Sequence, residues 1–178
     1  MGCTCDYVNI NLKTREMAET ALKLFAELLE EDLYGSFFDI DEIDIEEKED
    51  GFWVRFEEEP LFNTWDDGEQ IKLFVKEFIK KFPDEPFYLD NTTSFNNCGD
   101  TYYYEYIYDE NKKQLTIRTI YSEDSGLYYC PECEEYFDDP LVYIDEYKKG
   151  ETYTCPECGA EIEYDADETI QKIKLEDL

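Results

Sequence analysis

Residues 8–29 read VNINLKTREMAETALKLFAELL and set the pattern for the first two thirds of the chain. Apolar and polar side chains alternate over residues 8–12, which predicts a strand. Thr14 can cap a helix, and apolar side chains then recur at the spacing of one helical face. These are Met17, Ala21, Leu22, Phe25, Leu28 and Leu29. The segment therefore predicts a strand followed by an amphipathic helix.

Two further strands follow this pair. Residues 38–45 are strand-like, but their apolar side chains change phase, which predicts a bulge near Asp41-Glu42. Residues 48–51 end in Asp-Gly, a common hairpin signal. Phe52, Val54 and Phe56 then form one face of the third strand.

A second helix and a fourth strand complete the first part of the chain. Asp66 or Asp67 can cap the helix, Pro83 ends it, and residues 87–89 form the strand. The apolar stripe of this second helix consists of Ile71, Phe74, Val75, Phe78, Ile79 and Phe82. The order strand, helix, strand, strand, helix, strand predicts an α+β, ferredoxin-like fold, in which both helices cover one face of a four-stranded antiparallel sheet.

Residues 102–108 and 115–121 predict a β-hairpin that extends this sheet. In the first of these strands, Tyr102, Tyr104, Tyr106 and Tyr108 share one face and Tyr103 lies on the other. The polar break at 122–126 divides the chain into a predicted domain over residues 1–124 and a smaller one over 125–178. The tail from about residue 165 fits a helix or a strand equally well.

The smaller domain contains Cys130-Pro131-Glu132-Cys133 and Cys155-Pro156-Glu157-Cys158, separated by 21 residues. A Cys-x-x-Cys turn presents two thiolates to one metal ion, and two such turns supply the four tetrahedral ligands that zinc prefers. The chain has no histidine, so a site of soft ligands must consist of cysteines. The sequence therefore predicts one structural zinc, with iron as the alternative metal. A redox-active dithiol is the weaker interpretation, because one redox centre needs only one pair.

The segment from Tyr128 to Tyr164 resembles the zinc-ribbon family, in which two such turns at the ends of short hairpins hold one metal. The second turn continues with Gly159 as the family does, whereas the first has Glu134 at that position. Many zinc ribbons bind nucleic acid. This segment has eleven acidic residues against only Lys148 and Lys149, which favours contact with a protein.

The net charge of the whole chain is −31. Such a charge disfavours direct binding to nucleic acid and favours a basic protein as partner. No stretch of the sequence resembles a membrane helix or a secretion signal, so we expect a cytoplasmic protein that does not contact membranes.

Acidic residues concentrate in positions 39–50, where eight of twelve are Asp or Glu. They either protect a sheet edge or imitate the phosphates of a nucleic acid, so that the chain would inhibit a nucleic-acid-binding protein as a DNA mimic with an anti-defence role. The tyrosine face is the other candidate contact surface. The candidate partner-binding residues are Asp39, Asp41, Glu42, Asp44, Glu46, Glu47, Glu57, Glu58, Tyr102 and Tyr104.

The run Phe62-Asn63-Thr64-Trp65, the helix ending at Phe82-Pro83 and the strand after it are similar to the YubB-like domain of small plasmid and phage proteins. The resemblance covers about residues 5–121 and implies a ferredoxin-like domain from a mobile element, with no established activity.

No catalytic set emerges from the sequence, since it lacks histidine, a glycine-rich phosphate loop and a distinctive carboxylate pair. We therefore expect a non-enzymatic interaction module that inhibits or regulates a basic host protein. An enzyme or enzyme subunit with a carboxylate-lined pocket is the alternative. Cys3, Cys5 and Cys98 could form a second metal site, although free thiols are the commoner outcome.

Overall fold

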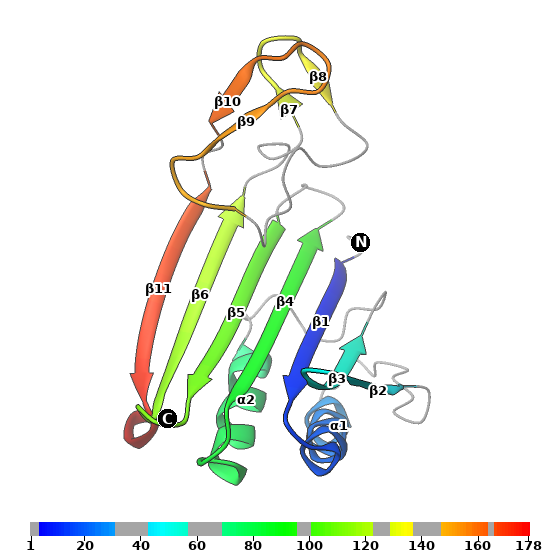
Figure 1. Cartoon of the computed structure of the whole chain (residues 1–178), viewed down its shortest axis with the longest axis vertical. Helices are drawn as coiled ribbons and strands as arrows, with labels where there is room; N and C mark the ends of the chain where they lie inside the picture. Colours follow the sequence, from blue (N-terminus) through cyan, green and yellow to red (C-terminus); the bar gives the residue numbers. More distant parts are fainter. Residues whose placement is uncertain are drawn as a thin grey trace.

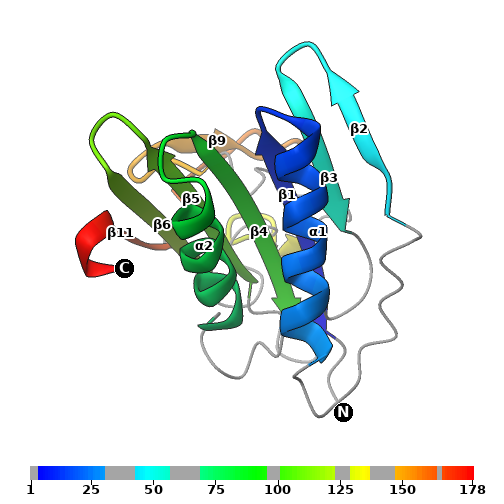
Figure 2. The same cartoon turned by 90° about the horizontal axis from the view of Figure 1, so that it is seen from below.

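The computed structural model describes residues 4–30, 43–56, 69–95, 101–122, 129–136, 147–163 and 166–178. They form an α+β structure, in which a seven-stranded antiparallel sheet carries α1 and α2 on one face (Figures 1 and 2). The strand order is β11-β6-β5-β4-β1-β3-β2. The helices are α1 (Arg15–Glu30) and α2 (Glu69–Lys81), and the strands of the sheet are β1 (Thr4–Leu12), β2 (Ile45–Lys48), β3 (Gly51–Phe56), β4 (Phe87–Phe95), β5 (Thr101–Asp109), β6 (Gln114–Ser122) and β11 (Asp167–Lys174).

Helix α1 starts where the sequence predicts. The backbone N–H of Met17 donates to Thr14 Oγ1 at 3.2 Å, so Thr14 caps the helix. Of the predicted apolar stripe, Met17, Ala21, Leu22 and Phe25 are buried and Leu28 is partly buried. The side chain of Leu29 lies outside the described residues.

Strands β2 and β3 form a tight hairpin at one edge of the sheet. Lys48 pairs with Gly51, so Glu49 and Asp50 make the turn that the Asp-Gly signal predicts. Gly51 has φ of +137°, and a Cβ there would lie 2.6 Å from the Leu12 carbonyl oxygen. Only glycine fits this close approach. Most of the predicted strand over 38–45, with its bulge, lies outside the described residues.

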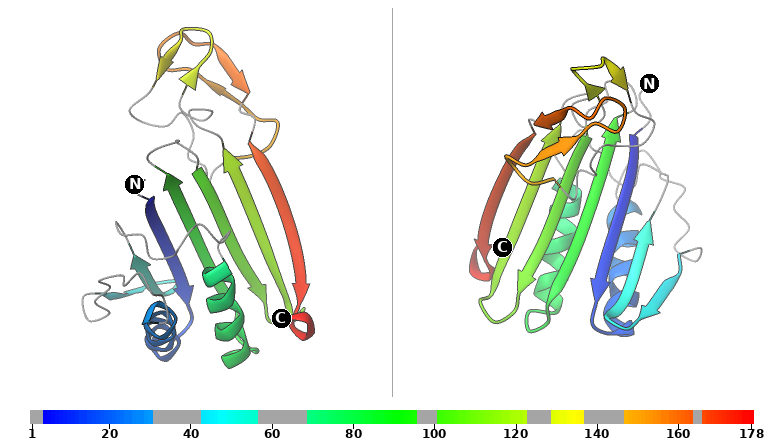
Figure 3. Two further views of the ribbon diagram at one scale, coloured as in Figure 1. Left: turned by 180° about the vertical axis from the view of Figure 1, so that it is seen from behind. Right: turned by 45° about the horizontal axis from the view of Figure 1, so that its top comes forward.

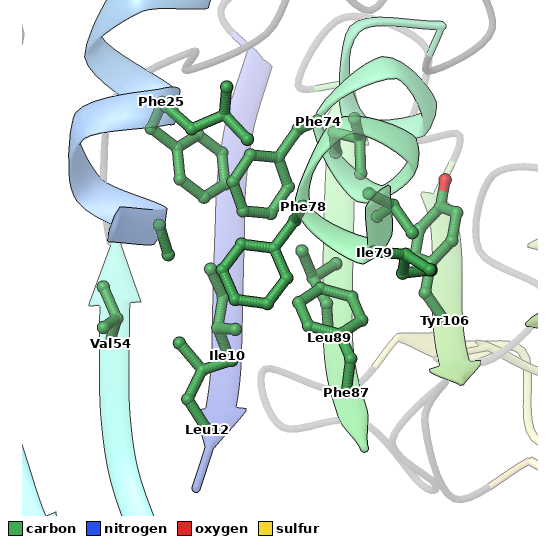
Figure 4. Packing of buried hydrophobic residues seen from close by; sticks show 14 of the residues in the cluster. Ile10, Leu12, Phe25, Val54, Phe74, Phe78, Ile79, Phe87, Leu89 and Tyr106 are labelled. Carbon is green, nitrogen blue, oxygen red and sulfur yellow. The ribbon is translucent and has the colours of Figure 1, made fainter. Parts of the chain in front are cut away.

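The main core fills the space between the helices and the sheet (Figure 4). Phe74 of α2 stacks on Phe25 of α1, with 3.8 Å between the ring centroids. Phe78 packs against Phe87 of β4 at 5.0 Å. The predicted stripe of α2 is buried from Ile71 to Ile79, with Phe82 partly buried. The helix ends before Pro83, as predicted, and its predicted cap lies outside the described residues.

The β5–β6 hairpin forms as predicted and extends the sheet beyond β4. Tyr106 and Tyr108 are buried in the main core, and Tyr108 donates its hydroxyl hydrogen to the Pro83 carbonyl oxygen at 2.9 Å. Tyr103, on the opposite face, is also buried. This part of the tyrosine ladder therefore packs the sheet.

The tail, whose conformation the sequence leaves open, forms β11 and pairs antiparallel with β6 along its whole length. A short 3-10 helix, η4 (Leu175–Asp177), follows it. The sheet thus contains residues from both sides of the predicted boundary at 124/125. That each side is a separate domain stays a prediction.

Candidate metal centre

Cys130, Cys133, Cys155 and Cys158 come together beyond one end of the sheet, where two small hairpins face each other (Figures 1 and 3). The hairpins are β7 (Tyr129–Cys130) with β8 (Glu135–Tyr136), and β9 (Thr152–Thr154) with β10 (Glu161–Glu163). All four Sγ atoms lie within 4.8 Å of one another. The Cys130–Cys158 pair is 3.7 Å apart and the Cys133–Cys155 pair 3.9 Å.

These sulfur–sulfur distances fit a tetrahedral metal ion. Four thiolates about 2.3 Å from zinc lie about 3.8 Å from one another. A disulfide would require about 2.05 Å, and all four cysteines are free thiols. The cluster can therefore hold an ion such as zinc, with each cysteine as one ligand.

The two Cys-Pro-Glu-Cys turns have the same backbone hydrogen bond. The N–H of Glu134 donates to the Cys130 carbonyl oxygen, and the N–H of Gly159 to that of Cys155, both at 2.9 Å. The donor residue is left-handed in each turn, with φ of +58° at Glu134 and +74° at Gly159. Glu134 therefore adopts the same left-handed conformation as Gly159 in the second turn.

Backbone N–H groups also point at the sulfurs. Burial raises the pKa of the Cys133 thiol to about 12, against an opposing hydrogen bond from the Glu135 backbone. Burial also acts to raise the pKa of Cys155, but backbone hydrogen bonds from Cys158 and Glu157 outweigh it and lower the value to about 7. Such N–H groups stabilise thiolates in knuckle-type sites. A bound cation would likewise stabilise the thiolate form of all four cysteines.

The cysteines belong to a second hydrophobic core. The first cysteine of each turn, Cys130 and Cys155, is buried, and both pack in one cluster with Tyr103 and Ile120 from the sheet face opposite the helices. Tyr147, Ile162 and Ala166 complete this cluster. The cysteine-bearing hairpins are therefore packed against the sheet.

Arg118 of β6 reinforces this contact. Its Nε donates to Glu168 Oε1 of β11 and its NH2 group donates to the Tyr147 carbonyl oxygen, both at 2.7 Å. The Tyr147 hydroxyl in turn donates to the Ala166 carbonyl oxygen at 3.2 Å. Arg118 and Glu168 have only about a fifth of their side-chain surface exposed, so this ion pair is better shielded from water than the surface pairs elsewhere.

Sequence reasoning missed Arg118, Tyr147 and the second core. One signal was available, because β5 and β6 have apolar side chains on both faces. Tyr103 pairs with Ile120 across the strands on one face, and Tyr106 pairs with Ile117 on the other. A strand that is apolar on both sides predicts cover on both sides.

The candidate partner-binding residues lie in two separate places. Asp44, Glu46 and Glu47 are exposed on or beside β2 at the sheet edge. Tyr102 and Tyr104 are half-buried on the helix-covered face of β5, and their rings stack at 6.2 Å. The remaining candidates lie outside the described residues: Asp39, Asp41, Glu42, Glu57 and Glu58.

A hollow of about 590 Å³ lies beside the acidic hairpin, at the end of the sheet away from the cysteines. Phe52, Pro86 and Ile107 contribute apolar surface to it. Glu47, Glu49 and Asp50 contribute carboxylates, and Lys13 and Lys48 contribute ammonium groups. Lys13 is paired with Glu85 at 2.7 Å and Lys48 with Glu46 at 3.0 Å, so carboxylates outside the lining already neutralise both cations.

The side chains of the second predicted cysteine group, Cys3, Cys5 and Cys98, lie outside the described residues. Within the described ranges, none of the helices is both long enough and apolar enough to cross a membrane. Comparison with protein-family models, with characterised proteins and with solved structures gives no significant match to this chain.

Proposed function

We propose that this chain is a non-catalytic zinc protein that binds a basic protein partner, and that its cysteine-bearing segment is a zinc ribbon anchored on a ferredoxin-like sheet. The observation that carries the proposal is the set of four thiols at tetrahedral spacing, held by two turns of the same shape. The ferredoxin-like assignment is supported by the strand order β4-β1-β3-β2, formed by elements in the chain order β-α-β-β-α-β.

A structural role for the metal follows from the ligand set. Four thiolates fill the tetrahedral shell of zinc and leave no open position for water or substrate. Two of the thiols are also buried in the second core, where they support packing against the sheet. The metal would therefore stabilise the contact between the ribbon and the sheet.

The surroundings of the ribbon favour a protein partner over a nucleic acid. Glu132, Glu134 and Glu135 are exposed around the first turn, and Glu157 and Glu161 around the second. A tetrathiolate zinc centre has a net charge of −2, which adds to this field. Phosphate groups would be repelled, whereas a basic protein surface would be attracted.

The hollow beside the β2–β3 hairpin is the contact site we propose for that partner. Its lysines are paired, so the charge it offers comes from Glu47, Glu49 and Asp50. An arginine or lysine side chain could lay its aliphatic part on Phe52 and Ile107 and place its cation among these carboxylates.

The zinc proposal is tested by metal analysis of the purified full-length chain. We expect about one zinc per chain, with a loss of tertiary structure in the second core on chelation. A ratio well below one, with structure unchanged by chelation, would refute it. Iron in place of zinc would support the four-cysteine metal site and identify its metal as iron.

The partner proposal is tested by capture of proteins from a cell lysate with matched variants. We expect Glu47→Gln/Glu49→Gln to lose basic prey that the wild-type chain retains, and to lose it most clearly at low salt. Glu161→Gln/Glu163→Gln removes the same charge from the ribbon and should keep that prey. Equal loss in both variants would show that net charge, and not the hollow, controls capture.

DNA mimicry is a second candidate, supported by the exposure of Asp44, Glu46, Glu47 and Glu49 along one edge hairpin. In that case the captured protein would bind DNA, and added duplex DNA would release it from the chain. Retention of the prey at saturating DNA would exclude mimicry and leave the basic-partner proposal standing.

A further inference from the structure

Among the described residues the sheet ends in two edge strands, β2 and β11, and these differ in length and chemistry. β2 is a four-residue edge strand, whereas β11 is an eight-residue edge strand. The side chains of β11 are mostly exposed, and Ile170 has 61% of its surface in water, more than any other large apolar side chain in the described ranges. A long edge with an exposed isoleucine is a template for another strand.

The hydrogen-bonding groups that β11 offers can be assigned from its pairing with β6. The N–H of Leu175 donates to the Lys113 carbonyl oxygen at 2.9 Å, which continues the β11–β6 register by one residue. Inward and outward backbone groups alternate along an antiparallel strand. Residues 169, 171 and 173 therefore face β6, and Glu168, Ile170 and Lys172 direct their N–H and C=O groups outward.

The side chains of these three residues lie on the sheet face opposite the helices. Glu168, Ile170 and Lys172 pair with Ile120, Arg118 and Thr116 of β6, and Ile120 belongs to the second core on that face. The outer edge thus presents an acidic, an apolar and a basic side chain in sequence, with the apolar one in the middle.

We propose that β11 pairs antiparallel with β11 of a second copy of this chain, in the register that sets Ile170 opposite Ile170. The same register sets Glu168 of each copy opposite Lys172 of the other. The outward backbone groups of all three residues then meet their counterparts as hydrogen-bonded pairs. Glu168 uses Oε1 for Arg118, and its Oε2 can accept from the lysine.

This arrangement is closed and symmetric. A two-fold axis through the Ile170 pair joins the two sheets, keeps the helices of both copies on one side and sends the ribbons to opposite ends. β2 is less suited to such pairing, because it has only four residues and a register centred on Glu46 or Glu47 sets that carboxylate opposite its own copy. Pairing of β2 with β11 would leave free edges and produce an open-ended assembly.

The net charge of −31 on each copy opposes this association over long distances. Salt at about 0.15 M limits such repulsion to a range of about 8 Å. The Glu168–Lys172 pairs act over shorter distances, so the extent of dimerisation should be measured at about 0.15 M salt.

Sedimentation velocity of the zinc-loaded full chain across a concentration series tests the proposal. We expect the wild type to shift from monomer to dimer. Lys172→Glu sets Glu opposite Glu twice and should weaken dimerisation about tenfold or more. Lys23→Glu makes the same charge change on the exposed surface of α1, away from the edge, and should leave dimerisation unchanged.

A mixture of two charge variants provides the decisive measurement. Glu168→Lys alone sets Lys opposite Lys, so it should also be monomeric, but mixed with Lys172→Glu it restores both attractive pairs. We expect the mixture to dimerise where each variant alone does not. If the wild type stays monomeric at all concentrations, if Lys172→Glu and Lys23→Glu behave alike, or if the mixture stays monomeric with both variants folded, the proposal is overturned.

Discussion

The two Cys-Pro-Glu-Cys turns differ at the residue that follows the second cysteine, which is Glu134 in the first turn and Gly159 in the second. Their backbones nevertheless agree in the left-handed φ and in a 2.9 Å hydrogen bond. A left-handed conformation costs about 1–2 kcal/mol for a residue with a Cβ. The first turn therefore bears a strain that the second avoids, so the shared turn shape does not require glycine at this position.

Loss of a ligand is the largest effect we expect, and it should be the same in both turns. Cys130→Ser and Cys155→Ser each remove one of four ligands and one buried member of the second core. We predict that the zinc-to-protein ratio falls from about one to well below one in both variants. Metal analysis measures it, with Thr152→Ser, an exposed position on β9 that is not a ligand, as control. Full zinc retention in either variant would contradict the four-ligand site.

Ile120→Ala tests whether the two turns share one support. Ile120 is fully buried and packs in one cluster with Cys130 and Cys155. We predict a loss of about 2–5 kcal/mol in the free energy of unfolding, together with faster release of zinc to a chelator. Thr116 lies on the same face of the same strand but is half-exposed. Thr116→Ala should therefore have little effect on the free energy of unfolding or on the rate of zinc release. Unchanged zinc release in Ile120→Ala would show that the cysteine-bearing hairpins hold the metal without support from the sheet.

Gly159→Ala introduces into the second turn the strain that the first already bears. No atom lies within 4 Å of the new Cβ, so the cost comes from the backbone alone and should be about 1–2 kcal/mol. Gly150→Ala is the matched control, because Gly150 is also left-handed and open but lies outside the turns. Both variants should lose stability in denaturant, and only Gly159→Ala should release zinc faster.

Glu134→Gly should produce the smallest effect, with the opposite sign. Glycine relieves the left-handed strain, so we predict a gain of up to about 1 kcal/mol and slower zinc release. Glu134→Gln removes the same charge and keeps the Cβ, so it separates strain from electrostatics. If both variants gain equally, repulsion between Glu134 and the thiolates explains the effect and the strain argument fails.

Local pattern was sufficient for much of the fold. The apolar stripe of α1, the Thr14 cap and the β5–β6 hairpin depend on residues close in sequence, and the structure confirms them. The four clustered cysteines were equally predictable, because Cys-x-x-Cys spacing is a local property. The structure brings all four together.

Contacts between distant segments could not be predicted in this way. The tail has Ile170 and Ile173 on opposite faces of β11, and their three-residue spacing also fits one face of a helix, so the apolar pattern did not decide between helix and strand. Its pairing with β6 depends on a return of the chain after residues 123–166. Likewise, nothing near Arg118 in sequence reveals its bonds to Tyr147 and Glu168, which are 29 and 50 residues away.

The return of β11 to β6 also bears on the order of events during synthesis. The helices and the strands from β1 to β6 leave the ribosome first, and domains generally fold as they emerge. Until β11 arrives, β6 is an open edge on which another chain could pair. Because β11 follows the cysteine segment, prompt zinc capture would hold that segment in place and shorten this exposure. Zinc supply in the cell would then influence how much newly made chain aggregates before it is complete.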